Sequence, residues 1–261
     1  MTTTPSKPSP PQLRSAFALG IAGTLATALL FPYVLALKPG SLALASAAMH
    51  LPAWAVVTVQ SLQNGVLCFL LAWAGLKLGA PLGLAAPWLA ARLYGRARPA
   101  SSAWLKAAAL GVAAGLLVIG AIALFGAPIE DMARKPHASV GFALKGLLAS
   151  PYGAIVEEVE LRVFVMGLFA WLLCRFSGGQ ARSWAMVAAI ILAALVFGAG
   201  HLPMAAQLAP LSLGVIARVV AYNALGGVVF GWLYWKRGLE HAMLAHFCAD
   251  LVLHVAAPLI A

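Results

Sequence analysis

Long apolar runs dominate the chain, and its polar residues gather in short stretches between them. Three such runs without a charged residue are Ala16–Leu37, Ala53–Leu76 and Ala107–Ala127. At about 1.5 Å of rise per residue, a helix over each run can cross a hydrocarbon core about 30 Å thick. The pattern therefore predicts an all-α fold, a polytopic transmembrane helix bundle.

The rest of the chain continues this pattern. A tail over residues 1–13, rich in Thr, Ser and Pro, is predicted to be disordered, and residues 14–261 to form a single transmembrane domain. Lys77–Lys106 is less regular, and we expect a loop with a short interfacial helix there. About seven membrane segments are predicted in all, the last three being Trp184–Leu202, Leu211–Trp235 and Leu239–Leu259.

The fourth segment, Val140–Cys174, is too long for one straight crossing. It contains Ser150-Pro151-Tyr152-Gly153, and a Pro and Gly pair of this kind predicts a break. We therefore expect a short helix that enters the bilayer, a break at Ser150–Gly153, and a second helix from about Tyr152 to Cys174.

Composition supports the membrane assignment. Of 261 residues, 63% are hydrophobic and 9% are charged, whereas soluble domains have about 25% charged residues. The net charge of +10 comes from basic residues scattered between apolar runs, so we expect no nucleic-acid partner. The three cysteines have no paired spacing, which argues against a disulfide framework or a zinc knuckle.

The basic residues instead predict the orientation in the membrane. With the N-terminus inside, eleven Lys and Arg fall in inner loops and three in outer loops, a bias typical of a cytoplasmic N-terminus. The compact, Ala-rich chain favours a bacterial inner membrane. The inner residues are Lys7, Arg14, Lys77, Arg92, Arg96, Arg98, Lys106, Arg175, Arg182, Lys236 and Arg237, and the outer ones are Lys38, Arg134 and Lys135.

A cluster of charges lies inside one of the apolar segments, where ionisable groups are costly and therefore candidates for function. It comprises Glu157, Glu158, Glu160 and Arg162. On a helix, Glu158 and Arg162 share a face and can pair, while Glu157 points about 100° away. Glu157 is thus available as a general base. A buried ion pair that only fixes packing would leave Glu157 without a partner, and we expect Glu160 to face a hydrated cleft or the helix end.

Two later segments carry histidines. Phe197 and His201 lie one turn apart, and so do His246 and Asp250. A single intrahelical histidine is usually a packing residue, but two beside a carboxylate cluster indicate a site. Further candidates are Gln60, Gln63 and Asn64 for interhelical hydrogen bonds, Arg218, Tyr222 and Asn223 for a cavity wall, and His50, His137, His241 and His254 as ordinary residues at segment ends.

Together these residues resemble the three motifs of the CPBP family of intramembrane proteases. That family contains type II CAAX prenyl endopeptidases and bacteriocin-processing and immunity-type proteins. The motifs are Glu157-Glu158-x-x-x-Arg162, Phe197-x-x-x-His201 and His246-x-x-x-Asp250, within a resemblance that covers about Gly146–Ala257. Each motif is short, but all three occur in order on separate apolar segments. The resemblance places a protease-like core at about residues 140–260.

The resemblance implies hydrolysis of a peptide bond in a membrane-associated or lipidated protein or peptide. Glu157 would activate water with help from His201, Glu158 and Arg162 would be the supporting pair, and His246 with residue 250 would stabilise the oxyanion. Phe197 would pack beside the site. Many members have Gly where this chain has Val163, and position 250 is also commonly Asn. An ionised Asp250 cannot donate to an oxyanion, but it could accept from one ring nitrogen of His246 and orient the other, or it could equally help to hold a metal.

The cofactor and two rival functions remain open at this point. The family has been interpreted both as metal-free glutamate proteases and as metalloproteases; we favour the metal-free form. Zn²⁺ is the alternative, with Glu157, His201 and His246 as ligands, although the motif His-Glu-x-x-His is absent. The rivals are a non-proteolytic scaffold or immunity-type member, and a proton-coupled transporter, which would predict an inverted repeat that the chain lacks.

Overall fold

The computed structural model describes residues 12–99, 103–129, 139–179 and 181–260, and every regular element in these ranges is helical. The elements are α1 (Leu13–Leu37), α2 (Ser41–Met49), α3 (Ala53–Gly79), η1 (Ala80–Leu82), α4 (Pro87–Tyr94), α5 (Trp104–Phe125), α7 (Val140–Tyr152), η2 (Gly153–Glu157), η3 (Val159–Met166), α8 (Gly167–Phe176), α9 (Ser183–Gly200), α10 (Leu202–Ala206), α11 (Leu213–Arg237), α12 (Leu239–Asp250), η4 (Leu251–Ala256) and α13 (Ala257–Ile260).

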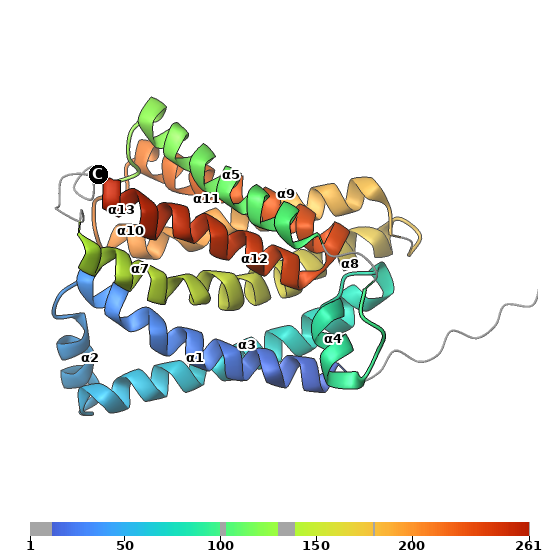
Figure 1. The fold of residues 1–261 in the computed structure, drawn as a ribbon, viewed down its shortest axis with the longest axis horizontal. Coiled ribbons are helices and arrows are strands. Elements are labelled where there is room, and N and C mark those ends of the chain that lie inside the picture. Colours follow the sequence, from blue (N-terminus) through green and yellow to red (C-terminus); the bar gives the residue numbers. More distant parts are fainter. Residues whose placement is uncertain (1–11, 100–102, 130–138, 180, 261) are drawn as a thin grey trace, which may run out of the picture.

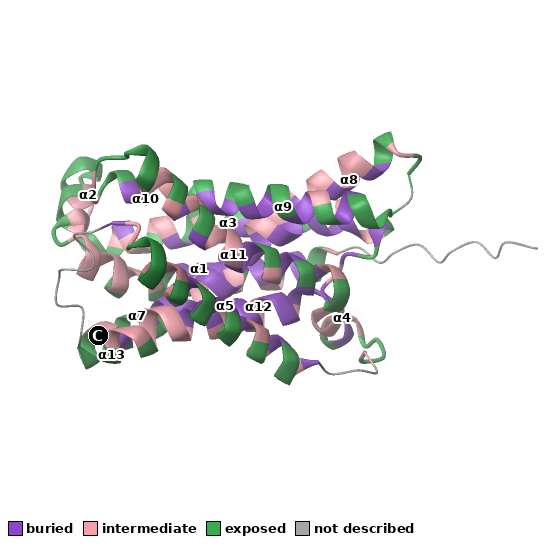
Figure 2. Ribbon diagram, turned by 90° about the horizontal axis from the view of Figure 1, so that it is seen from above, coloured by how far each residue is buried: buried purple, intermediate pink, exposed green. Residues whose placement is uncertain are grey.

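Six helical stretches within the described residues are long and apolar enough to cross a membrane: Leu13–Leu37, Ala53–Leu82, Trp104–Phe125, Ser183–Ala206, Leu213–Arg237 and Leu239–Ile260. A further helical stretch runs from Val140 to Phe176 through the bundle. Large apolar side chains such as Phe17, Leu117 and Val187 are exposed on the outer faces, and the buried residues line the interior (Figure 2). The polytopic all-α bundle is therefore confirmed.

The central position of the Val140–Phe176 stretch determines where the site lies. It is packed between α1 and α3 on one side and α9, α11 and α12 on the other (Figure 1). Close approach depends on glycine: a Cβ on Gly75 would collide with the Val163 carbonyl group, and one on Gly111 with the Ala245 carbonyl group. Small residues at these crossings bring the helix backbones together, as is usual in membrane bundles.

The prediction of a break at Ser150–Gly153 is wrong, because the helix continues there and only its hydrogen-bonding pattern changes. The chain stays helical through Pro151, and at Gly153 the winding changes from α to π. Proline removes one N–H donor and crowds the carbonyl group one turn earlier, which ordinarily kinks an α-helix. The wider π winding, with its i to i+5 hydrogen bonds, follows directly and keeps the backbone paired. The result is one continuous stretch instead of two helices.

Short helices lie at the two ends of the bundle. The predicted interfacial helix is present as α4, and Glu240 Oε1 accepts a hydrogen bond of 2.7 Å from the Leu89 N–H in its first turn. At the opposite end, α2 joins α1 to α3, and the pattern of apolar runs does not predict it (Figure 1). Of the tail predicted to be disordered, residues 1–11 lie outside the described residues, and α1 begins at Leu13.

Candidate active site

The two adjacent glutamates lie where the central stretch is π-wound. Glu157 ends η2, and Glu158 stands between η2 and η3. Single π turns within α-helices are rare and occur frequently at functional sites. The two side chains have different surroundings: that of Glu158 is fully buried, whereas that of Glu157 is 21% exposed. Neighbours in sequence therefore occupy different environments.

Glu158 is held by two partners. Its Oε1 atom lies 3.2 Å from Arg162 Nη2, one turn along the same stretch, so the predicted ion pair forms. The same Oε1 atom accepts a hydrogen bond of 2.8 Å from His246 Nδ1 on α12. The guanidinium carbon of Arg162 lies 4.9 Å from the ring centre of Phe197 and 5.6 Å from that of Phe230. A buried charge pair thus fixes the His246 ring.

The bond at Nδ1 leaves His246 Nε2 facing the site, and this corrects one expectation. The sequence suggests that Asp250 orients the ring, but its Oδ1 atom is 3.7 Å from Nε2, the other ring nitrogen. Glu158 orients the imidazole instead, because its carboxylate reaches Nδ1 from the neighbouring helix. Phe230 stacks on the ring at a centroid distance of 4.4 Å, which holds the plane of the imidazole.

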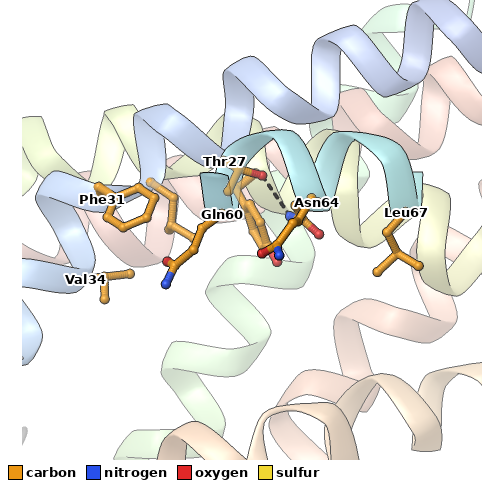
Figure 3. A pocket seen from close by; sticks show the side chains of 9 residues that line it. Thr27, Phe31, Val34, Gln60, Asn64 and Leu67 are labelled. Atoms are coloured by element: carbon orange, nitrogen blue, oxygen red, sulfur yellow. Dashed lines mark hydrogen bonds between the residues drawn. The ribbon is translucent and has the colours of Figure 1, made fainter. Parts of the chain in front are cut away.

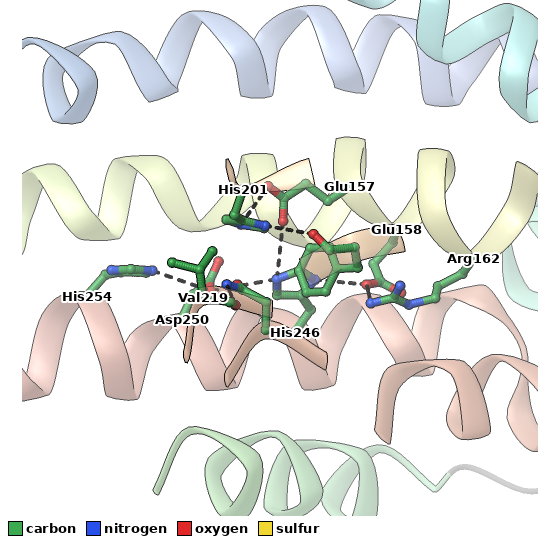
Figure 4. A network of polar contacts seen from close by, with 10 residues as sticks. Glu157, Glu158, Arg162, His201, Val219, His246, Asp250 and His254 are labelled. Carbon is green, nitrogen blue, oxygen red and sulfur yellow. Dashed lines mark hydrogen bonds and ion pairs between the residues drawn. The ribbon is translucent and has the colours of Figure 1, made fainter. Parts of the chain in front are cut away.

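Glu157 stands between the two histidines (Figure 4). Its Oε2 atom is 3.6 Å from His246 Nε2, and its Oε1 atom is 3.9 Å from His201 Nε2. Both separations exceed a direct hydrogen bond and can be bridged by one small molecule. His201 Nδ1 donates to the Phe197 carbonyl oxygen at 2.9 Å, which turns Nε2 toward Glu157. The structure thus brings together all three motifs.

Three residues beside this cluster are not predicted from the sequence. His254, expected to be an ordinary residue at a segment end, places Nε2 3.9 Å from Asp250 Oδ1, and its Nδ1 atom is 3.0 Å from the Tyr33 hydroxyl group on α1. Gly153 lies too close to the cluster to carry a side chain. An ideal Cβ there would lie 2.6 Å from Asp250 Oδ2 and 3.0 Å from His246 Nε2. The four-residue spacing from Asp250 could have identified His254, but no local pattern indicates Gly153 or Tyr33.

Among the described residues, the other candidates make no hydrogen bond or ion pair with this cluster. Glu160 makes no hydrogen bond or ion pair with any described residue. Tyr222 donates to the Gly126 carbonyl oxygen at 2.8 Å and Asn223 to that of Val219 at 2.8 Å, so both are occupied with backbone contacts. His241 is buried against Trp104, with ring centres 4.2 Å apart. His50 ends α2, and His137 lies outside the described residues.

A metal would have to be held by Glu157, His201 and His246. Zinc takes carboxylate oxygen and imidazole nitrogen, so the donor types suit it. However, within the described parts of the chain no group of three or more His, Cys, Asp or Glu residues converges closely enough to hold an ion. The bond from His246 Nδ1 to Glu158 leaves Nε2 as the ring nitrogen that a metal would meet, and Glu157 Oε2 and Oε1 lie 3.6 and 3.9 Å from His246 Nε2 and His201 Nε2.

Comparison with known proteins gives one match. Residues 139–252 match the model of the family described as type II CAAX prenyl endopeptidase Rce1-like. The matched range contains the three motifs from Glu157 to Asp250 and excludes α1 to α5 and His254. No curated protein and no solved structure matches the chain.

Proposed function

We propose that this protein is an intramembrane endopeptidase in which Glu157 activates water, because residues 139–252 match the model of the type II CAAX prenyl endopeptidase Rce1-like family and lie within a multi-pass membrane bundle. The observation that carries the proposal is the position of the Glu157 carboxylate between His201 Nε2 and His246 Nε2. Glu158, fully buried and bonded to Arg162 and His246, serves as the support of this arrangement.

In the first step, Glu157 and His201 hold the nucleophile. His201 Nδ1 donates to a carbonyl oxygen, which can only accept, so the neutral ring presents an unprotonated Nε2. A water molecule between the two residues can donate one O–H to Glu157 and the other to His201. As its oxygen attacks the carbonyl carbon of the substrate, its proton passes to the Glu157 carboxylate and the carbonyl electrons become an oxyanion.

His246 stabilises that oxyanion. Its Nδ1–H donates to Glu158, so donation from Nε2 as well requires the imidazolium form. The carboxyl groups of Glu157, Glu158 and Asp250 surround the ring and balance its charge. When the intermediate collapses, the C–N bond breaks and the leaving amine takes the proton from Glu157. The products are a carboxylic acid and an amine.

The substrate is a membrane-associated protein or peptide, and a lipidated one fits the same proposal. We further propose a bacterial inner membrane with the N-terminus in the cytoplasm. Arg92 belongs to α4, the Arg14 N–H at the start of α1 donates to the hydroxyl group of Tyr94 in α4, and Lys77 and Lys236 lie in the last turns of α3 and α11, whereas Lys38 ends α1 on the side that leads to α2. Such a bias toward one end supports that orientation.

The test compares Glu157→Gln with Glu160→Gln in purified protein, on a library of membrane peptides. Both variants lose one carboxylate from the same stretch, but only Glu157 faces the histidines. Loss of a general base lowers kcat by about 10²- to 10⁴-fold, so we expect this for Glu157→Gln. Glu160→Gln should stay within about twofold of wild type, as substitutions away from a site do.

The same assay separates the rival functions. Cleavage that persists with a strong chelator supports the glutamate mechanism, and cleavage that is lost and then restored by zinc makes the site metallic. A Glu157→Gln protein as active as wild type contradicts the assignment of the base. If wild-type protein in bilayers cleaves no peptide, the scaffold alternative is favoured.

A further inference from the structure

A cavity of about 390 Å³ lies between α1 and α3, and of its lining residues only Tyr152 belongs to the range matched by the family. Its size is within the usual range of ligand sites. One wall is apolar and comes mostly from α1, while the other carries side-chain amides from α3 (Figure 3). The lining residues are Thr27, Leu30, Phe31, Val34, Gln60, Gln63, Asn64, Leu67 and Tyr152.

The amides on α3 are only partly satisfied. Asn64 Nδ2 donates to Thr27 Oγ1 at 2.7 Å, which confirms the interhelical hydrogen bond expected there. Gln60 and Gln63 make no hydrogen bond with any described residue. Gln60 is half-buried and Gln63 is exposed, and both belong to a stretch long and apolar enough to span the membrane, where an amide that faces lipid has no water to bond. These two side chains therefore call for a polar ligand.

The cavity is linked to the candidate active site through Tyr152. Tyr152 lines the cavity and immediately precedes the π-wound turn that ends at Glu157. A ligand in the cavity is thus about one π turn from the proposed base.

An unwound peptide is the ligand that this chemistry fits. A peptide bond inside a transmembrane helix is shielded, so its neighbours must leave the helix before attack, and their N–H and C=O groups then lose their partners. Carboxamides both donate and accept hydrogen bonds and can pair with such groups. The apolar side of the cavity can contact side chains of the same segment.

We propose that Gln60 and Gln63 bind the unwound main chain of the peptide substrate beside the bond that is cleaved. This inference rests on the proposed function and adds α1 and α3 to the substrate site. Recognition through the main chain also predicts little dependence on the side chains of the bound segment.

The test uses depsipeptides, in which one backbone N–H is replaced by an ester oxygen. The probe is the library peptide that binds best to the Glu157→Gln protein in nanodiscs, labelled with a fluorophore and resynthesised with an ester at each position in turn. Binding is measured with Gln60→Leu, Gln63→Leu and, as the matched control, Thr58→Val. Thr58 is exposed on the same helix and donates to its own helix at Trp54.

One ester position should weaken binding by about 2- to 10-fold, the value of one hydrogen bond, and the effect should disappear in one of the glutamine variants but persist in Thr58→Val. Ester effects that are equal in all three variants overturn the proposal, and so does displacement of the peptide by phospholipid. If an ester effect disappears in a glutamine variant but wild-type protein cleaves no peptide, the cavity assignment is retained and the proposed function is contradicted. If wild-type protein cleaves the peptide but no ester effect depends on Gln60 or Gln63, the proposed function is retained and the cavity assignment is overturned. A protein that neither binds nor cleaves the peptide overturns both.

Discussion

Replacing Gly153 by alanine tests the geometry of the site with a single methyl group. The backbone at Gly153 is right-handed helical, with φ −56° and ψ −49°, so alanine suits it. The obstacle is space. The new Cβ would lie 2.6 Å from Asp250 Oδ2, and ordinary contact begins at 3.4 Å, so the two groups must separate by about 0.8 Å. Displacing catalytic groups by about 1 Å can cost about 10²-fold in rate.

We therefore expect Gly153→Ala to lower kcat by about 10- to 100-fold. The assay is steady-state cleavage of the best library peptide in nanodiscs, with thermal unfolding of each variant to show that it folds. Gly141→Ala is the matched control, because Gly141 lies on α7 of the same stretch and nothing stands within 4 Å of its Cβ position. That variant should keep wild-type activity.

A double mutant identifies the colliding partner. Asp250→Ala removes the nearer of the two groups that the new methyl group would meet and leaves the 3.0 Å approach to His246 Nε2, so Gly153→Ala should cost less in that background than in wild type. Effects of contacting residues are non-additive in this way. The reasoning is refuted if folded Gly153→Ala protein cleaves as fast as Gly141→Ala, or if the two substitutions multiply as independent effects.

Two further predictions concern the surroundings of the site, and a third concerns the orientation of the chain in the membrane. Arg162→Met strands the buried carboxylate that pairs with it, and unfolding in detergent should show a loss of about 3–5 kcal/mol; an unchanged stability would contradict the pair. Tyr33→Phe removes one neutral hydrogen bond to His254, so kcat should fall less than about tenfold, and a loss as large as that of Glu157→Gln would make Tyr33 a reacting group. In a chain without other cysteines, Arg96→Cys should react with impermeant reagent only from the cytoplasm and Pro39→Cys only from outside; the opposite result reverses the orientation.

Much of the fold could be predicted because the bilayer imposes a length on each apolar run. The segments Trp184–Leu202 and Leu211–Trp235 correspond closely to α9 and α11. The prediction of a break at Pro151 was wrong, because proline is expected to kink or end an α-helix. The π-helix that follows at Gly153 keeps the stretch continuous, and no local sequence pattern predicts it. The stretch that forms α2, between the first two apolar runs, is too short to span a membrane, so run length alone predicts only a connection there.

Within the site, residues that are four apart in sequence could be paired, and contacts between helices could not. The pairing of Glu158 with Arg162 follows from helix geometry alone. Counting residues from the predicted inner loops places His246 nearer the membrane surface than Glu157. At the end of the bundle that carries α4, however, the loop between α8 and α9 extends beyond the start of α12 (Figure 1). This offset between helices brings the residues level, and neither it nor the bond from His246 to Glu158 has a signal along the chain.

In the proposed mechanism, the two adjacent glutamates have different tasks. A carboxylate that orients His246 must be fixed, and the full burial of Glu158 against Arg162 supplies this. A carboxylate that exchanges a proton with water must be reachable, and Glu157 retains partial exposure. Glu158 cannot meet both demands, because Oε1 takes both contacts and the burial that immobilises the side chain also keeps Oε2 from water. Successive side chains on a helix point about 100° apart, so Glu157 and Glu158 meet different neighbours. Adjacent positions on one helix can therefore divide the two roles.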